Sequence, residues 1–136
     1  MRIYTADLSL KSGAKIDLID ITGELFNHLS KSKVTDGIMI AYSPHTTAAL
    51  IINENEPRLA GDIKMAVKDI ISWEKDYAHN LIDSNAPSHI VAAFLGNTLN
   101  LPISRGKIEL GTWQSVFLLE LDGPRSRQVK VKIIGE

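Results

Sequence analysis

Residues 113–134, WQSVFLLELDGPRSRQVKVKII, carry the clearest β pattern of the chain. The tripeptide 122–124 combines Asp, Gly and Pro, which favour a turn. After that turn, apolar side chains occupy every second position: Val129, Val131 and Ile133. Alternation of period two is typical of a strand with one buried face. We therefore expect 113–121 and 128–134 to pair as a β-hairpin.

The N-terminal segment shows a similar pattern. Residues 2–10 alternate loosely between apolar and polar side chains, Ser12 and Gly13 interrupt them, and residues 15–21 alternate again. We expect 2–10 and 15–21 to form a second hairpin. The continuous apolar run 38–42 predicts a strand buried on both faces, and 48–53 predicts a further strand.

Helices are expected between these strands. A short helix begins with Thr22 as its N-cap. A longer helix has Pro57 in its first turn and an apolar stripe at spacings of three and four. A third helix runs from Pro87 to Gly96, with Ile90, Val91, Phe94 and Leu95 turned inward. The fold class is α+β: one domain over residues 1–136, with a mainly antiparallel sheet and two to three helices.

Composition excludes several kinds of protein. The 136 residues include no cysteine, so a disulfide scaffold, a thiolate metal site and a cysteine nucleophile are excluded. A net charge of −1 argues against a nucleic-acid-binding surface and a polybasic membrane anchor. No apolar run approaches the roughly 20 residues of a membrane span, and charge comes too early for a signal peptide. We expect a cytoplasmic protein.

Three of the four histidines lie at expected ends of elements: His45 after a strand, His79 in a loop and His89 in the first turn of a helix. His28 is expected to face solvent without a partner. Imidazole is a common metal ligand, and three ligands leave one position open for water or substrate. The spacing matches no zinc motif, so the spacing alone favours surface or capping histidines.

Two arginines, Arg125 and Arg127, stand two residues apart. On an extended segment both guanidinium groups point to one side, where they suit a phosphate or a carboxylate. The alternative is that they pair with acids of the chain such as Glu120 or Asp122, and the residues alone favour this alternative.

Other catalytic motifs are absent. The chain has no glycine-rich phosphate loop and no GxSxG elbow. Trp113 is expected in the core, because indole rings usually are, and Gln114 would then face solvent or a site. Composition and spacing thus predict an α+β domain with a polar cleft lined by histidine and arginine.

Five ordered motifs narrow the assignment: Pro44-His45-Thr46-Thr47-Ala48-Ala49 followed by Asn53-Glu54; Tyr77-x-His79; Asn85-Ala86-Pro87-Ser88-His89; Leu110-Gly111-Thr112-Trp113-Gln114; and Asp122-Gly123-Pro124-Arg125-x-Arg127. Together, over nearly the whole chain, they closely resemble the YjbQ family, also called secondary thiamine-phosphate synthase enzymes. The resemblance implies a compact α+β fold and a homotrimer.

The resemblance also implies an activity: coupling of the pyrimidine and thiazole halves of thiamine phosphate with loss of pyrophosphate, as a main or a side activity. It implies that three histidines cluster around a metal or a polar site, and we expect a divalent metal there: His45, His79 and His89. Imidazoles without thiolate favour zinc, with magnesium as the second choice. It further implies catalytic roles for Glu54, Arg125 and Arg127, and substrate contacts for Thr46, Thr47, Asn53, Trp113 and Gln114.

Three other functions remain open on the same residues. A metal-assisted phosphate-ester hydrolase would use a metal-bound water as nucleophile. A trimeric binding protein would hold a phosphorylated metabolite without turning it over. A structural trimer would use its histidines only to cap elements.

Overall fold

The structure, a computed structural model, describes all residues from Met1 to Glu136. It contains α1 (Thr22–Ser32), α2 (Pro57–Ile70), α3 (Ala86–Leu95) and a short 3₁₀ helix η1 (Ala78–Leu81). The strands are β1 (Arg2–Lys11), β2 (Asp17–Asp20), β3 (Gly37–Tyr42), β4 (Ala48–Asn53), β5 (Thr98–Ser104), β6 (Lys107–Ile108), β7 (Ser115–Glu120) and β8 (Ser126–Gly135). The α+β class is confirmed, and β5 and β6 are strands that the sequence pattern did not predict.

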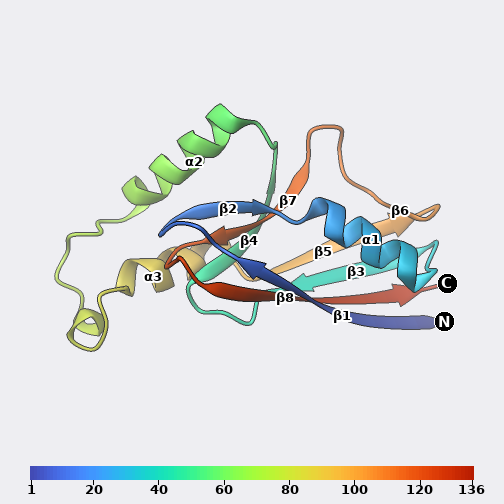
Figure 1. Ribbon diagram of the computed structural model, residues 1–136, viewed down its shortest axis with the longest axis horizontal. Coiled ribbons are helices and arrows are strands. Elements are labelled where there is room, and N and C mark those ends of the chain that lie inside the picture. Colours follow the sequence, from blue (N-terminus) through green and yellow to red (C-terminus); the bar gives the residue numbers. More distant parts are fainter.

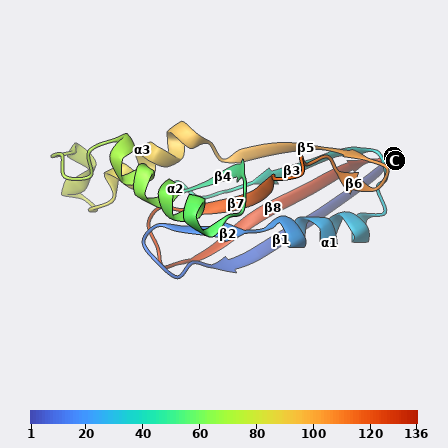
Figure 2. The ribbon, with the colours of Figure 1, turned by 90° about the horizontal axis from the view of Figure 1, so that it is seen from above.

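The strands form two antiparallel sheets rather than one. The larger sheet has the order β1-β8-β3-β5-β6, and the smaller sheet has the order β2-β7-β4. The two sheets lie against each other, and α1 packs beside the smaller sheet on the same face of the larger one (Figures 1 and 2). Helices α2 and α3 cover the other face of the smaller sheet, and the outer face of the larger sheet is left open.

Two apolar cores follow from this layering. The larger core lies between the sheets and α1, and β8 contributes to it its alternating residues Val129, Val131 and Ile133. The smaller core lies between the smaller sheet and the helices, where Leu119 of β7 meets Val67 of α2 and Val91 of α3. Successive residues of β7 therefore face different cores, as the period of a strand requires.

Both predicted hairpins are wrong in their pairing. Strand β1 pairs with β8, with Leu10 opposite Arg127, and β2 pairs with β7, with Asp17 opposite Glu120. The segments 12–16 and 121–125 are therefore corners that carry the chain from one sheet to the other. Period-two alternation fixes which side chains are buried, but it contains no information about which strand lies alongside.

Smaller details also differ from expectation. Strand β3 buries only one face: Met39 is fully buried, whereas Tyr42 is 41% exposed on the open side of the larger sheet. Val91 of α3 is buried as expected, but Phe94 and Leu95 point outward and are 74% and 39% exposed. Thr22 is the first residue of α1 rather than its cap, and its Oγ1 accepts from the backbone N–H of Val116 at 2.8 Å. His28 has a partner, the hydroxyl of Tyr4, at 2.8 Å.

Three corners meet at one end of the sandwich. The segments 12–16, 43–47 and 121–125 each join a strand of one sheet to a strand of the other. The chain termini lie at the opposite end (Figure 1). None of the helices has the length and hydropathy that crossing a bilayer requires.

Candidate functional site

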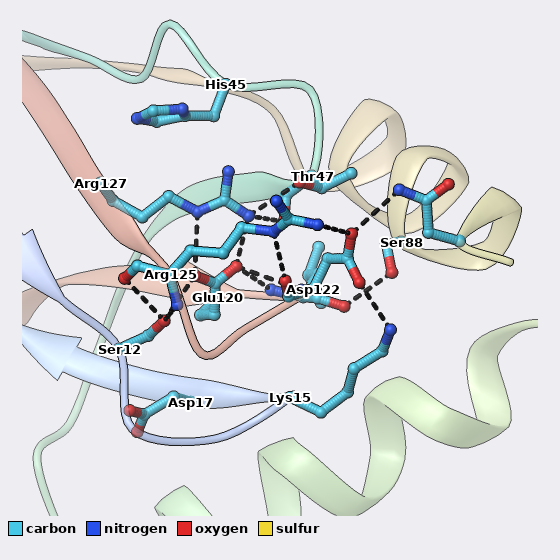
Figure 3. Close-up of polar contacts among 12 residues, drawn as sticks. Ser12, Lys15, Asp17, His45, Thr47, Ser88, Glu120, Asp122, Arg125 and Arg127 are labelled. Atoms are coloured by element: carbon cyan, nitrogen blue, oxygen red, sulfur yellow. Dashed lines mark hydrogen bonds and ion pairs between the residues drawn. The ribbon is translucent and has the colours of Figure 1, made fainter. Parts of the chain in front are cut away.

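The site begins with a buried ion pair that joins the two sheets. Arg127 extends the inward-facing row of β8, and Glu120 extends the inward-facing row of β7. Their side chains are 5% and 0% exposed. Arg127 donates from Nε to Glu120 Oε1 at 2.8 Å, and its Nη2 donates to Oε2. The same Nη2 reaches the hydroxyl of Thr47 at 2.7 Å, so the guanidinium ties β7, β8 and the corner 43–47 together (Figure 3).

Glu120 is fully supplied with donors. The hydroxyl of Ser12 donates to its Oε1 at 2.7 Å, and the backbone N–H groups of Leu121 and Asp122 each donate to Oε2 at 3.1 Å. Burial by itself raises the pKa of Glu120, but the hydrogen bonds from Arg127 and Ser12 outweigh it and hold the pKa below its ordinary value. The carboxylate is therefore ionised at neutral pH.

Asp122 forms a second junction beside the first. Its Oδ1 accepts from Lys15 Nζ at 2.6 Å, and its Oδ2 accepts from Asn85 at 2.9 Å and from Arg125 Nη2 at 3.0 Å. Burial by itself raises the pKa of Asp122, but the hydrogen bonds from Lys15, Asn85 and Arg125 outweigh burial, so the pKa lies below its ordinary value. Arg125 remains half-exposed, with a side-chain exposure of 52%.

His45 lies in the corner between β3 and β4, next to the guanidinium of Arg127 (Figure 3). Its Nε2 accepts the backbone N–H of Gln128 at 2.9 Å, which fixes the proton of the neutral ring on Nδ1. Burial first, and the positive charge of Arg127 second, lower the pKa of His45. The ring is thus neutral at neutral pH and has an N–H to donate.

His79 and His89 lie together on the neighbouring helices. Their ring centroids are 4.8 Å apart in an edge-to-face arrangement. His79 Nε2 lies 3.2 Å from the side-chain oxygen of Asn85, the residue whose amide nitrogen binds Asp122. The hydroxyl of Ser88 donates to the carbonyl of Leu121 at 2.6 Å and fixes the first turn of α3 against the corner.

Two cavities meet at His45. One, of about 330 Å³, lies between the corner 43–47 and α3, with His45 and His89 on its wall. The other, of about 700 Å³, opens beside β1 and β8 and is lined mainly by polar residues, among them Lys11, His45 and Arg127. Arg127 has one terminal nitrogen, Nη1, that makes no hydrogen bond. This second cavity is called the cationic groove below.

The histidines do not fit a three-ligand metal site as they are arranged. No group of three or more His, Cys, Asp or Glu side chains lies close enough together to hold a metal ion. The Nε2 lone pair of His45 is taken by Gln128, and only His45 and His89 share a cavity. The structure therefore brings the histidines to one end of the molecule without forming a coordination sphere.

The other expected site residues divide into two groups. Thr46 lines the cavity between His45 and His89, and Thr47 binds Arg127. Asn53, Glu54, Trp113 and Gln114 lie at the opposite end of the smaller sheet, where Asn53 pairs with Ser115. The five steps along β4 from Ala48 to Asn53 separate the two ends by about 17 Å. Within one chain, Glu54 cannot act on the same small molecule as His45.

The expectation that Trp113 lies in the core is wrong. Its side chain is 72% exposed in the loop between β6 and β7. Gln114 does not face a site; its Oε1 accepts the backbone N–H of Gly111 at 2.8 Å. The loop brings neither side chain to the cationic groove.

Several residues that line the site have no signal in the sequence. The cationic groove is lined by four such residues: Ser9, Lys11, Ser126 and Gln128. In the sequence their pattern indicates only the solvent-facing side of an alternating strand. Glu120 offered one signal: it directly follows the apolar run 116–119, and an acid that is buried together with such a run needs a cation as its partner.

Comparison with known proteins gives a family. The family model described as UPF0047 protein YjbQ-like matches residues 6–136. A UPF0047 protein of Methanothermobacter thermautotrophicus is 42% identical over 136 residues, which cover 100% of this chain and 95% of that protein. The UPF0047 protein YugU of Bacillus subtilis is 32% identical over 129 residues, which cover 94% of this chain and 97% of that protein.

Solved structures agree with the sequence comparison. A YbjQ-like protein of unknown function from Sulfolobus solfataricus superposes with a TM-score of 0.97 at 39% identity, covering 99% of both chains. A hypothetical protein from Aeropyrum pernix superposes with a TM-score of 0.95 at 35% identity, covering 98% of this chain and 99% of that one. Since both the sequence and the fold match over nearly the full length, this chain belongs to the UPF0047 family of YjbQ-like proteins.

Proposed function

We propose that the protein is an enzyme that acts on a phosphorylated small molecule, with a thiamine-phosphate synthase type of reaction that displaces pyrophosphate. The observation that carries the proposal is the cationic groove, where a neutral His45 lies beside Lys11 and the free Nη1 of Arg127. Cationic nitrogens and N–H donors that converge on one cavity suit a phosphate or a pyrophosphate.

Electrostatics supports binding of an anion in this groove. Arg127 is held rigidly by Glu120 and Thr47, so its free nitrogen needs no reorganisation to meet a ligand. The His45 ring holds its proton on Nδ1 and can donate it in a hydrogen bond without being charged. Arg125 lines an adjoining cavity of about 240 Å³ that shares Lys11 and Ser126 with the groove.

The proposed reaction makes one bond and breaks one. The thiazole nitrogen attacks the methylene carbon of the pyrimidine pyrophosphate, and the carbon–oxygen bond to pyrophosphate breaks. The electron pair of that bond leaves with pyrophosphate. Lys11, Arg125 and Arg127 would stabilise the negative charge that develops on the leaving group.

A homotrimer would reconcile the two groups of site residues. The open face of the larger sheet exposes Ile3, Ile38 and Tyr42, which a neighbouring subunit could cover. Asn53, Glu54, Trp113 and Gln114 lie at the far end of the smaller sheet, about 17 Å along β4 from the corner that carries His45, so they would contact the substrate only from a neighbouring subunit. Light scattering coupled to size-exclusion chromatography measures the oligomeric state. A monomer would rule out substrate contacts by these four residues.

Zinc binding by His45, His79 and His89 stays a prediction, and it requires His45 to release the backbone N–H of Gln128. Elemental analysis of untagged protein, before and after dialysis against zinc, tests it. About one equivalent of zinc per chain that is lost in His89→Ala would support the metal site. The control His28→Ala removes an imidazole far from the site. An equal zinc content in His89→Ala and His28→Ala would contradict the metal site.

The function is tested by turnover with purified protein. We expect formation of thiamine phosphate and pyrophosphate from the two phosphorylated halves, and loss of turnover by at least tenfold in Arg125→Ala and His45→Gln. Arg105→Ala, which removes an exposed arginine from the β5–β6 turn, is the matched control and keeps wild-type turnover. Full activity in both site variants would remove the groove from the reaction.

A non-catalytic binding protein is the second candidate, and one observation favours it. The Nε2 lone pair of His45 is occupied, so the groove presents donors and no free base. Calorimetric binding of inorganic pyrophosphate without any product by mass spectrometry would select this candidate. Phosphate release without a thiazole acceptor would instead select a phosphate-ester hydrolase.

A further inference from the structure

A third cavity lies on the other side of Lys15 from Asp122. Its volume is about 430 Å³, within the usual range of small-molecule sites. It lies between the corner that precedes β2 and the C-terminal end of α2, and Figure 3 shows Lys15 reaching from that corner between Asp122 and the helix. Its lining is compact: Lys15, Ile16, Lys68, Ser72, Trp73 and Glu74.

The apolar part of this cavity is firmly placed. Ile16 is 8% exposed and belongs to the smaller core, against which the half-buried ring of Trp73 packs. The indole N–H of Trp73 lies 3.3 Å from the carbonyl oxygen of Val67, to which it donates. The ring therefore has no polar group left for a ligand, and what it offers is aromatic surface for stacking.

The polar part of the cavity offers both signs of charge. Lys15 is already paired with Asp122 at 2.6 Å, whereas Lys68, in the last turn of α2, has no carboxylate partner. Glu74 adds an acceptor, and Ser72 adds a hydroxyl. A ligand that satisfies this wall needs an anion for Lys68, hydrogen-bond donors for Glu74, and a flat ring for Trp73.

We propose that this cavity is a binding site for a nucleoside monophosphate or a ligand of the same chemistry: an aromatic ring, a hydroxylated middle part and a phosphate. The ring stacks on Trp73, the hydroxyls donate to Glu74, and the phosphate accepts from Lys68. This site is independent of the cationic groove and stands whether or not the function proposed above is correct.

The two tryptophans of the chain make the test direct. The variant Trp113→Phe removes the exposed loop indole and leaves Trp73 as the only reporter. In this background, adenosine 5′-monophosphate is titrated while the fluorescence of Trp73 is recorded. We expect saturable quenching of the Trp73 fluorescence. Adenosine alone and inorganic phosphate alone should bind more weakly, because adenosine lacks the phosphate for Lys68 and phosphate lacks the ring for Trp73.

Two lysine variants separate a built site from general electrostatics. Lys68→Ala is expected to weaken the binding of adenosine 5′-monophosphate by about tenfold, and Glu74→Gln by less. Lys64→Ala, one turn earlier on α2 and outside the cavity lining, removes the same charge and should leave the affinity unchanged. Absence of saturable quenching, equal affinity for adenosine alone, or equal losses in Lys64→Ala and Lys68→Ala would each overturn the proposal.

Discussion

Replacing Arg127 by Met tests whether this arginine holds the two sheets together. The substitution keeps the length of the side chain and removes two hydrogen bonds to the carboxylate of Glu120 and those to Thr47. Each bond to a charged group contributes about 1.5–3 kcal/mol, so the two bonds to Glu120 give about 3–6 kcal/mol. This agrees with the roughly 3–5 kcal/mol that breaking a buried ion pair costs.

Urea unfolding followed by circular dichroism measures the loss. Protein concentration is held fixed, because any self-association would shift the apparent stability. We expect Arg127→Met to lower the free energy of unfolding by about 3–5 kcal/mol at an unchanged denaturant slope. The double variant Arg127→Met/Glu120→Gln should recover about half of that loss, because the amide removes the unpaired charge and keeps an acceptor for Ser12.

Two outcomes would refute the role of Arg127 as a tie between the sheets. One is a loss below about 1 kcal/mol in Arg127→Met, the size of an exposed ion pair. The other is a double variant as unstable as the single one, which would show that the charge of Glu120 is not what the arginine compensates. Either result would mean that Arg127 does not stabilise the fold and that only a catalytic role explains it.

Three further predictions concern the corners. Because the pKa of His45 is lowered in the fold, its contribution to stability is complete above about pH 6.5 and is lost as the pH falls through the lowered pKa. Urea unfolding at pH 7 and pH 5 should therefore show a smaller decline in the free energy of unfolding for His45→Gln than for the wild type. Equal declines in the two proteins would contradict this. Gly123→Ala would place a Cβ 2.7 Å from Ser12 Oγ and against the carbonyl of Ala14, which should lower the free energy of unfolding by about 1–3 kcal/mol. In the control Gly61→Ala, in α2, the new Cβ has no atom within 4 Å, and the free energy of unfolding should rise by about 0.5–1 kcal/mol in the same assay. Ser88→Ala leaves the buried carbonyl of Leu121 without its side-chain donor and should cost about 1–3 kcal/mol, read from the urea midpoint; no shift would mean that this bond does not anchor α3.

The sequence predicted the elements of this fold better than their partners. Alternation placed Val129 and Val131 on a buried face, and the structure confirms it. Pairing was wrong at both chain ends, because strands close in sequence were assumed to pair, whereas β1 pairs with β8 across nearly the whole chain. Burial depends on local pattern, but pairing is decided by which layers of side chains complete a core.

The sequence predicted the acids that pair with the two arginines, but not that one of these pairs is buried. Arg125 and Arg127 do bind Asp122 and Glu120, as the alternative interpretation held. The inward position of Glu120 becomes visible only once β7 and β8 are assigned to different sheets that face each other. The separation of Glu54 from His45 had no sequence signal either, since motifs give order along the chain and not distance.

The three corners at one end of the sandwich have a consequence for engineering. The short connections 12–16, 43–47 and 121–125 supply polar partners such as Ser12, Thr47 and Asp122, and two of them also place Ile16 and Leu121 in the smaller core. Ligand preference could therefore be transplanted between relatives only by exchanging these connections as a set together with the strand ends 9–11 and 126–128, which line the cationic groove. Exchanging one connection alone would leave Ser12, Thr47 or Asp122 facing mismatched neighbours, so such chimaeras should keep their fold only when all three connections are exchanged together.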